Sequence, residues 1–221
     1  MVHVVSISQK GSKSTVNEDA CLALPAKGIF VVADGVGGGP AGDFASRTLV
    51  NEIEGRCASG ENPEQDLLAA IQSANQKIFH AGQQPRLNGM ATTVAALVLG
   101  AGSILVCHVG DSRVYRLAAG RLTALTRDHS KLLDRGGESK KSVVTNALGL
   151  RDTVKIELNR FDLEPEDRLY LMTDGISDVV EEQRMAELLG HQGSTSEGLM
   201  ALVAESEALG GKDDKTILCV F

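Results

Sequence analysis

Long hydrophobic runs and clusters of basic residues are missing from this 221-residue chain, and each absence argues against a class of protein. No stretch approaches the roughly 18 apolar residues that a membrane-spanning helix needs, and the first residues, MVHVVSISQKG, lack the regions of a secretory signal. The net charge is −7, and basic residues form only short pairs such as Lys140-Lys141. We therefore expect a cytoplasmic protein with no membrane or nucleic-acid partner.

Cysteine pairs and a phosphate-binding glycine loop are also missing. Cys21, Cys57, Cys107 and Cys219 are far apart and form no CxxC pair, which favours buried free thiols in a reducing compartment over a zinc site or a disulfide framework. The glycines between positions 35 and 39 are not followed by GKS or GKT, so the stretch is not a P-loop.

What is present predicts one domain over residues 1–221, because 221 residues that are 43% hydrophobic can bury one core. Period-two alternation predicts strands over residues 2–8, 20–24, 29–32, 92–99, 103–109, 112–117, 121–125, 154–158, 168–173 and 216–221. Apolar residues at helical spacing predict helices over residues 41–57, 63–80, 181–189 and 196–209. Residues 127–141 have no clean period, which predicts an irregular flap with a short helix over residues 131–134. This order favours an α+β domain whose antiparallel sheets carry helices on their outer faces.

The stretch VVADGVGGGPAGDFAS, residues 31–46, is the strongest local pattern. An apolar strand ends at Asp34, and Gly35 and Gly37 to Gly39 then allow the backbone to approach a ligand closely. Carboxylate oxygen is a ligand that Mg²⁺ and Mn²⁺ prefer, but an Asp in such a turn can equally cap its own backbone. Both interpretations of Asp34 stay open on this stretch alone.

Further acids follow other apolar strands in the same way. Asp111 follows CHVG, Asp174 follows LYLMT, and Asp213 and Asp214 precede the last strand. Each could cap a turn, but carboxylates that meet at one end of a sheet repel one another unless cations neutralise them. With no His or Cys at ligand spacing, the expected cations are Mg²⁺ or Mn²⁺. Two such ions can lower the pKa of a shared water and deliver it to a phosphorus atom.

Eight ordered segments together resemble the PPM, or type 2C, metal-dependent Ser/Thr protein phosphatases in their compact bacterial form: VNEDA, VVADGVGGGPAGDFAS, GMATTVAAL, CHVGDSRVYRL, LTRDHS, TNALG, DRLYLMTDGISD and DDKTILCVF. The resemblance implies a β-sandwich of two antiparallel sheets flanked by pairs of helices, with two Mn²⁺ or Mg²⁺ ions at one end. It implies that Asp34 bridges the two ions, that the Gly35 carbonyl binds one, and that Asp174 and Asp213 complete the other. Glu18 and Asp19 would hold metal-bound waters, and Asp111 would serve a third metal site.

Three positions depart from the family pattern. Ser14 stands where an Arg that binds the substrate phosphate is usual, and we expect the neighbouring Lys13 to take over part of that role, although Lys lacks the bidentate fork of Arg. Asp214 replaces an Asn, and Val36 stands where eukaryotic members carry a histidine proposed as general acid. His129, in TRDHS, is interpreted mainly as ordering the loop below the flap, and Arg113 mainly as a structural ion-pair partner.

The resulting hypothesis is a phosphatase that hydrolyses phosphoserine and phosphothreonine with a metal-activated water, as a monomer that reverses a Ser/Thr kinase. A weakly active phosphoprotein-binding module is the alternative, kept open by Ser14. A structural metal-binding domain is a third hypothesis, disfavoured because structural Ca²⁺ loops gather their ligands locally.

Overall fold

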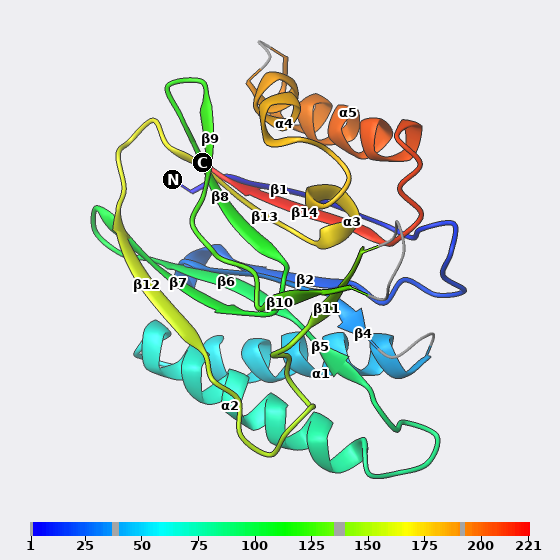
Figure 1. The fold of residues 1–221 in the computed structure, drawn as a ribbon. Coiled ribbons are helices and arrows are strands. Elements are labelled where there is room, and N and C mark those ends of the chain that lie inside the picture. Colours follow the sequence, from blue (N-terminus) through cyan, green and yellow to red (C-terminus); the bar gives the residue numbers. More distant parts are fainter. Residues whose placement is uncertain (1, 37–39, 135–139, 191–192) are drawn as a thin grey trace.

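Two antiparallel five-stranded sheets lie face to face between two groups of helices (Figure 1). The computed structural model describes residues 2–36, 40–134, 140–190 and 193–221, so the predictions made for Gly37 to Gly39 and for the flap over residues 135–139 lie outside the described residues. The strands of the first sheet run in the order β1-β14-β13-β8-β9: Val4–Gln9, Lys215–Val220, Arg168–Met172, Arg113–Ala118 and Arg121–Ala124. Those of the second run in the order β12-β7-β6-β3-β2: Glu157–Asp162, Ser103–Val109, Val94–Leu99, Ile29–Ala33 and Ala20–Leu24.

Helices cover the outer face of each sheet, as predicted. Helices α1 (Pro40–Cys57) and α2 (Pro63–Ala81) cover the second sheet, and α4 (Glu182–Leu189) and α5 (Thr195–Ala208) cover the first (Figure 1). Asn62 caps α2 by accepting the Gln65 N–H at 3.2 Å. Side chains that alternate along the strands fill one apolar layer between the sheets and one beneath each helix pair. None of the described helices is long and apolar enough to cross a membrane.

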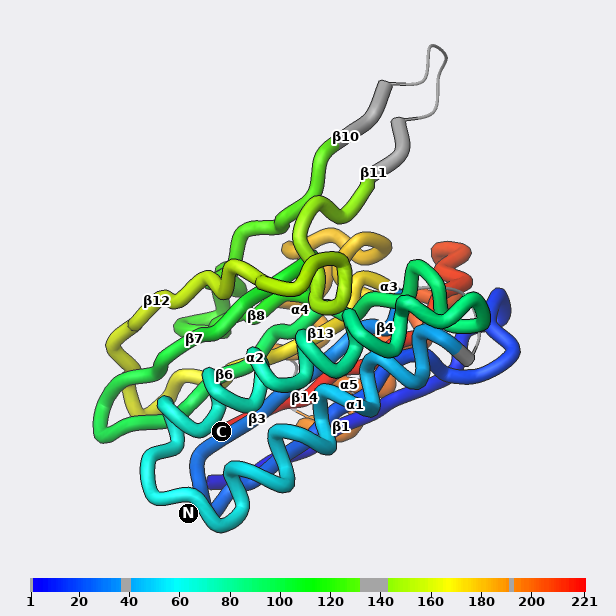
Figure 2. Tube along the Cα trace, turned by 90° about the horizontal axis from the view of Figure 1, so that it is seen from below, coloured from blue at the N-terminus to red at the C-terminus, as the bar shows by residue number. Residues whose placement is uncertain are grey.

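The prediction of an irregular segment over residues 127–141 is confirmed for residues 127–129, which lie in no helix or strand, and is wrong for residues 130–134 and 140–141, which belong to a β-hairpin. Strands β10 (Ser130–Asp134) and β11 (Lys140–Val144) pair with each other, so residues 131–134 are extended and not helical. The hairpin projects from the body of the molecule (Figure 2). Pairing between the two strands of the hairpin, which the periodicity of each strand does not report, decides this structure.

Four smaller features also differ from the sequence prediction. Strand β12 begins at Glu157 and not at residue 154, because its register is set by pairing with β7, from Glu157 opposite His108 to Asp162 opposite Ser103. A four-residue helix, α3 (Asp174–Ser177), follows β13, and a 3-10 turn (Pro25–Lys27) connects β2 to β3. A two-stranded ladder joins β4 (Gly35–Val36) to β5 (Ala91–Thr92) beside the end of β3.

Candidate metal centre

The backbone of Asp34 is held by two threonines where β3 ends. The Asp34 N–H donates to Thr93 Oγ1 at 2.9 Å, and the Asp34 carbonyl accepts the Thr93 N–H and the Thr92 hydroxyl, both at 2.9 Å. The carboxyl group of Asp34 forms its hydrogen bond with the carboxyl group of Asp174. Of the two interpretations left open by the sequence, this geometry favours a ligand over a backbone cap.

The glycine after each of these aspartates is explained by close packing. A Cβ atom on Gly35 would collide with the carbonyl oxygens of Gly42 and Glu18, so no side chain fits between β4 and the first turn of α1. A Cβ atom on Gly175 would likewise collide with the carbonyl oxygen of Asp214. In both Asp-Gly sequences the glycine therefore allows close contact with another segment of backbone. Neither glycine has a positive φ, so the need for glycine is steric.

Five aspartates lie close enough around these segments for the charge of one to raise the pKa of another: Asp19, Asp34, Asp111, Asp174 and Asp213. Burial, followed by the negative charge of Asp174, raises the pKa of Asp34 well above its usual range. Burial also raises the pKa of Asp174, and the charge of Asp213 adds to this rise. The pKa of Asp19 and that of Asp111 are each raised to about 7, again mainly by burial. Such a cluster favours bound cations, because they would stabilise the ionised carboxylates.

One atom in the cluster tests directly whether the site fits a metal ion. Asp174 Oδ1 is buried and has no hydrogen-bond partner among the described residues. A buried carboxylate oxygen without a partner is costly unless a cation or water satisfies it. The atoms that could bind a metal ion here are carboxylate oxygens, which suit Mg²⁺ or Mn²⁺ better than Zn²⁺.

Hydrogen bonds from hydroxyl and backbone N–H groups hold the acids of the cluster and the loops that carry them. Thr173 Oγ1 donates to Asp19 Oδ2 at 2.8 Å, and the Thr216 N–H donates to Thr173 Oγ1 at 3.0 Å. Asp214 accepts the Gly11 N–H with one oxygen and the Glu18 N–H with the other, both at 2.7 Å. Asp214 therefore ties the loop before β14 to the loop before β2, which gives its carboxylate a structural role.

Lys13 lies at the rim of the centre. Its Nζ atom is 3.4 Å from Asp213 Oδ2, and its backbone N–H donates to the Lys212 carbonyl at 3.0 Å. The Lys13 side chain is 71% exposed, so it can reach a ligand outside the acids. The Ser14 carbonyl accepts the Lys10 ammonium at 2.8 Å, which places Ser14 within the same loop.

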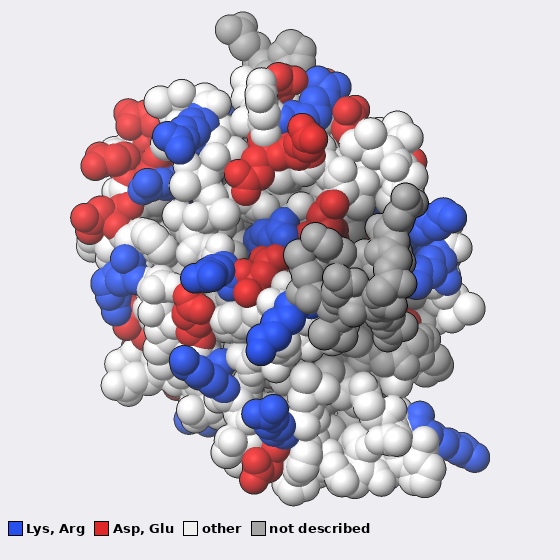
Figure 3. All heavy atoms as spheres, viewed as in Figure 1, with Lys and Arg blue, Asp and Glu red and all other residues white. Residues whose placement is uncertain are grey.

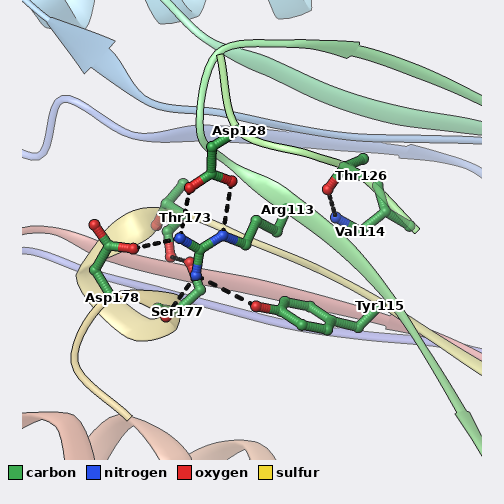
Figure 4. Close-up of polar contacts among 8 residues, drawn as sticks. All are labelled: Arg113, Val114, Tyr115, Thr126, Asp128, Thr173, Ser177 and Asp178. Atoms are coloured by element: carbon green, nitrogen blue, oxygen red, sulfur yellow. Dashed lines mark hydrogen bonds and ion pairs between the residues drawn. The ribbon is translucent and has the colours of Figure 1, made fainter. Parts of the chain in front are cut away.

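Arg113 joins three segments around the centre, as its structural interpretation predicted (Figure 4). Its guanidinium binds both oxygens of Asp128, at 2.8 and 2.6 Å, and Asp178 Oδ1 at 2.6 Å. It also donates to the Ser177 carbonyl at 2.7 Å. The network fixes α3, whose first residue is Asp174. The sequence pattern predicted an ion-pair role for Arg113 but did not identify its partners, Asp128 and Asp178.

A second group of ligating side chains lies below the β10–β11 hairpin. Single ligand atoms of His108, His129 and Glu157 lie within 4.8 Å of one another. His129 Nδ1 accepts the Gly110 N–H at 3.3 Å and faces the Asn146 amide at 3.1 Å, so its proton resides on Nε2, 3.0 Å from Glu157 Oε2. A cation there would displace that proton, and the geometry supports the interpretation that His129 orders this loop.

The described cysteines give no alternative nucleophile. All four are free thiols, as expected, and all but the partly buried Cys21 are buried. Burial raises the pKa of Cys107 to about 12 and those of Cys57 and Cys219 to about 11, and a thiol that stays protonated is a poor nucleophile.

A β-sandwich between helix pairs, with buried acids at one end, defines the class of metal-dependent phosphatases. The family model for protein phosphatase 2C matches residues 9–202. The serine/threonine phosphatase Stp of Listeria welshimeri is 33% identical over 210 residues, which cover 87% of this chain and 83% of that protein. The chain belongs to the protein phosphatase 2C family, and it is a metal-dependent serine/threonine phosphatase.

Solved structures agree with this membership. PppA, a key regulatory component of T6SS in Pseudomonas aeruginosa, superimposes with a TM-score of 0.89 at 30% identity, covering 99% of this chain and 96% of PppA. The catalytic domain of the phosphatase PstP in complex with two manganese ions gives a TM-score of 0.85 at 26% identity, covering 99% and 97% of the two chains.

Proposed function

We propose that Asp34, Asp174 and Asp213 hold two divalent ions, Mn²⁺ or Mg²⁺, in one phosphatase domain that spans residues 1–221. The observation that carries this proposal is the buried, unpartnered Oδ1 of Asp174 beside the hydrogen-bonded carboxyl of Asp34. The structure of PstP with two manganese ions supports the same number of ions. When bound, such ions supply positive charge and an activated water for in-line attack on phosphorus.

The roles proposed for the remaining acids follow from their positions. Glu18 and Asp19 hold waters around the ions, with Asp19 oriented by Thr173. The Gly35 carbonyl adds a neutral oxygen ligand, and Asp111, whose carboxylate lies near that of Asp174, serves a third metal site.

Lys13 is proposed to attract the substrate phosphate in place of the usual arginine. Its ammonium is exposed beside Asp213, whereas the Ser14 side chain carries no charge. A lysine neutralises phosphate as a point charge without the bidentate geometry of arginine. Val36 has no proton to give, so we assign protonation of the leaving hydroxyl to a water.

The substrates are phosphorylated proteins, and the proposed natural counterpart is a Ser/Thr kinase of the same cell. We further propose a monomeric, cytoplasmic enzyme. Membership of a family of Ser/Thr phosphatases argues against the alternative of a phosphoprotein-binding module, which Ser14 had kept open.

Manganese-dependent phosphate release from a phosphothreonine peptide tests the proposal. We expect turnover in the native chain, loss of turnover with EDTA, and loss in Asp174→Asn, which keeps the size of the side chain. Calorimetry on the same variant should show fewer or weaker Mn²⁺ sites. A native chain that binds the peptide with Mn²⁺ present but releases no phosphate would instead support the binding module.

A further inference from the structure

A pocket of about 600 Å³ lies at the base of the β10–β11 hairpin, outside the acid cluster. Its walls come from the connection between β9 and β10 and from the segment that leads from β11 to β12. The described residues that line it are Arg127, Asp128, His129, Ser130, Thr145, Asn146, Arg151, Lys155 and Glu157. Figure 3, in the orientation of Figure 1, shows Lys and Arg side chains near the segment that leads from β11 to β12, beside the grey atoms.

The pocket has a surplus of positive charge although the chain carries −7. Arg127, Arg151 and Lys155 are exposed, and their side chains make no ion pair or hydrogen bond with any residue that the structure describes. The two acids of the pocket are already engaged. Asp128 uses both oxygens on Arg113, and Glu157 binds His129 and Asn159. Three cations that have no partner within the described part of the chain therefore face one cavity.

The frame that carries these cations is held by backbone hydrogen bonds. The Thr145 N–H and hydroxyl donate to the His129 carbonyl at 2.7 and 2.9 Å, so the two walls are joined. The Asn146 amide donates to the Lys155 carbonyl at 2.9 Å. A fixed frame lowers the conformational cost of binding an anion between mobile cationic side chains.

Hydrogen bonds and one ion pair connect the pocket to the acid cluster on two sides. The His129 N–H donates to the Gly110 carbonyl at 2.7 Å, and Gly110 directly precedes Asp111. On the other side, Asp128 binds Arg113, which in turn holds the Ser177 carbonyl of α3. A polypeptide whose phosphorylated residue lies at the acid cluster would therefore have the pocket as a neighbour.

We propose that this pocket binds a second anionic side chain, phosphorylated or carboxylic, on the same substrate protein. The proposal rests on the phosphatase function and adds a determinant of substrate choice to it. Arginine and lysine with hydroxyl and amide donors nearby are the groups that recognise phosphate and carboxylate. Substrates with two anionic side chains at the correct spacing are expected to bind more tightly than those with one.

Peptide kinetics with Mn²⁺ test the proposal. Each peptide carries one phosphothreonine and, two to eight residues away on either side, an alanine, a glutamate or a phosphonate analogue that cannot be hydrolysed. This ladder spans roughly 7 to 28 Å of extended chain. For at least one spacing we expect the phosphonate peptide to have a KM about three- to tenfold below that of the alanine peptide, as one or two exposed charge pairs provide. The KM of the glutamate peptides shows whether a carboxylate binds the pocket as well as a phosphonate does.

Variants separate this pocket from the catalytic centre. The double variant Arg151→Ala/Lys155→Ala should lose the preference and still hydrolyse p-nitrophenyl phosphate at the native rate. Arg121→Ala, which removes an exposed cation of β9, should keep the preference. The proposal is overturned if no spacing discriminates, or if the double variant discriminates as well as the native chain. A native chain that does not hydrolyse p-nitrophenyl phosphate would instead count against the phosphatase function. Fluorescence anisotropy of the same peptides would then show whether the pocket still prefers a second anionic side chain.

Discussion

Asp214 binds the backbone of Glu18 across almost the whole length of the sequence, with the Glu18 N–H donating to Asp214 Oδ2 at 2.7 Å. The other oxygen of Asp214 accepts the Gly11 N–H at the same distance. A carboxylate can accept both bonds, whereas an amide in that place offers one oxygen and one NH₂ group. This relationship explains why an acid fits at a position where the family usually carries Asn.

We therefore expect Asp214→Asn to lower the free energy of unfolding by about 1 kcal/mol, since one backbone N–H would lose its acceptor. Asp214→Ala removes both acceptors and should cost more, about 2–4 kcal/mol. Urea unfolding of the metal-free chain measures both values. Equal stability of the native chain and Asp214→Asn would show that the two bonds do not act as described.

Gly35→Ala should destabilise the chain by at least about 2 kcal/mol, because the new methyl group would enter the contact between β4 and α1. Gly55→Ala is the matched control, since a Cβ atom at Gly55 would meet nothing within 4 Å. Gly55 lies within α1, where alanine is preferred, so this substitution should stabilise the chain by about 0.5–1 kcal/mol. Thermal unfolding of the two variants should shift Tm in opposite directions. A Gly35→Ala variant as stable as the native chain would contradict the packing argument.

The sequence pattern predicted antiparallel sheets covered by helices, because the core strands are short apolar runs bounded by turn residues, and the family resemblance implied that the two sheets form a sandwich. Residues 20–24 form β2 as expected, and most of the other predicted strands and helices are present with shifted ends. The β10–β11 hairpin was missed because, among the described residues, its strands pair only with each other, and their sequences, SKLLD and KKSVV, do not alternate apolar and polar residues.

The acids of the site could be predicted for a similar reason. Asp34 and Asp174 each follow a buried strand, so the sequence pattern and the resemblance both pointed to them. The groups that support them could not be found in this way. Thr93, Asp128 and Asp178 act through contacts between segments that lie far apart in the sequence, and nothing in their local sequence marks those contacts.

Stabilisation by Mn²⁺ should increase as the pH rises from about 5 to 8. Burial raises the pKa of Asp19 and Asp111 to about 7, above their values in the unfolded chain. At pH values between the unfolded and the folded pKa, the metal-free folded state binds more protons than the unfolded state. Its stability therefore falls as the pH rises through about 7. Ions bind the ionised carboxylates, so protons compete less with Mn²⁺ at high pH. Differential scanning fluorimetry with Mn²⁺ and with EDTA should show a larger difference in Tm at pH 8 than at pH 5.5. A difference that is constant or shrinks with pH would contradict this assignment.

Lys13→Ala should raise the KM for a phosphothreonine peptide about fivefold and leave kcat nearly unchanged, as expected for the loss of one exposed charge that binds phosphate. Its Nζ atom is 3.4 Å from an Asp213 side chain that is itself 47% exposed, so stability should not change measurably. Lys13→Arg should lower KM, because a guanidinium adds the bidentate contact that a lysine lacks. Lys77→Ala, which removes an exposed lysine of α2, controls for general loss of charge. If Lys13→Ala and Lys77→Ala have the same KM as the native chain, the phosphate contact must come from another residue.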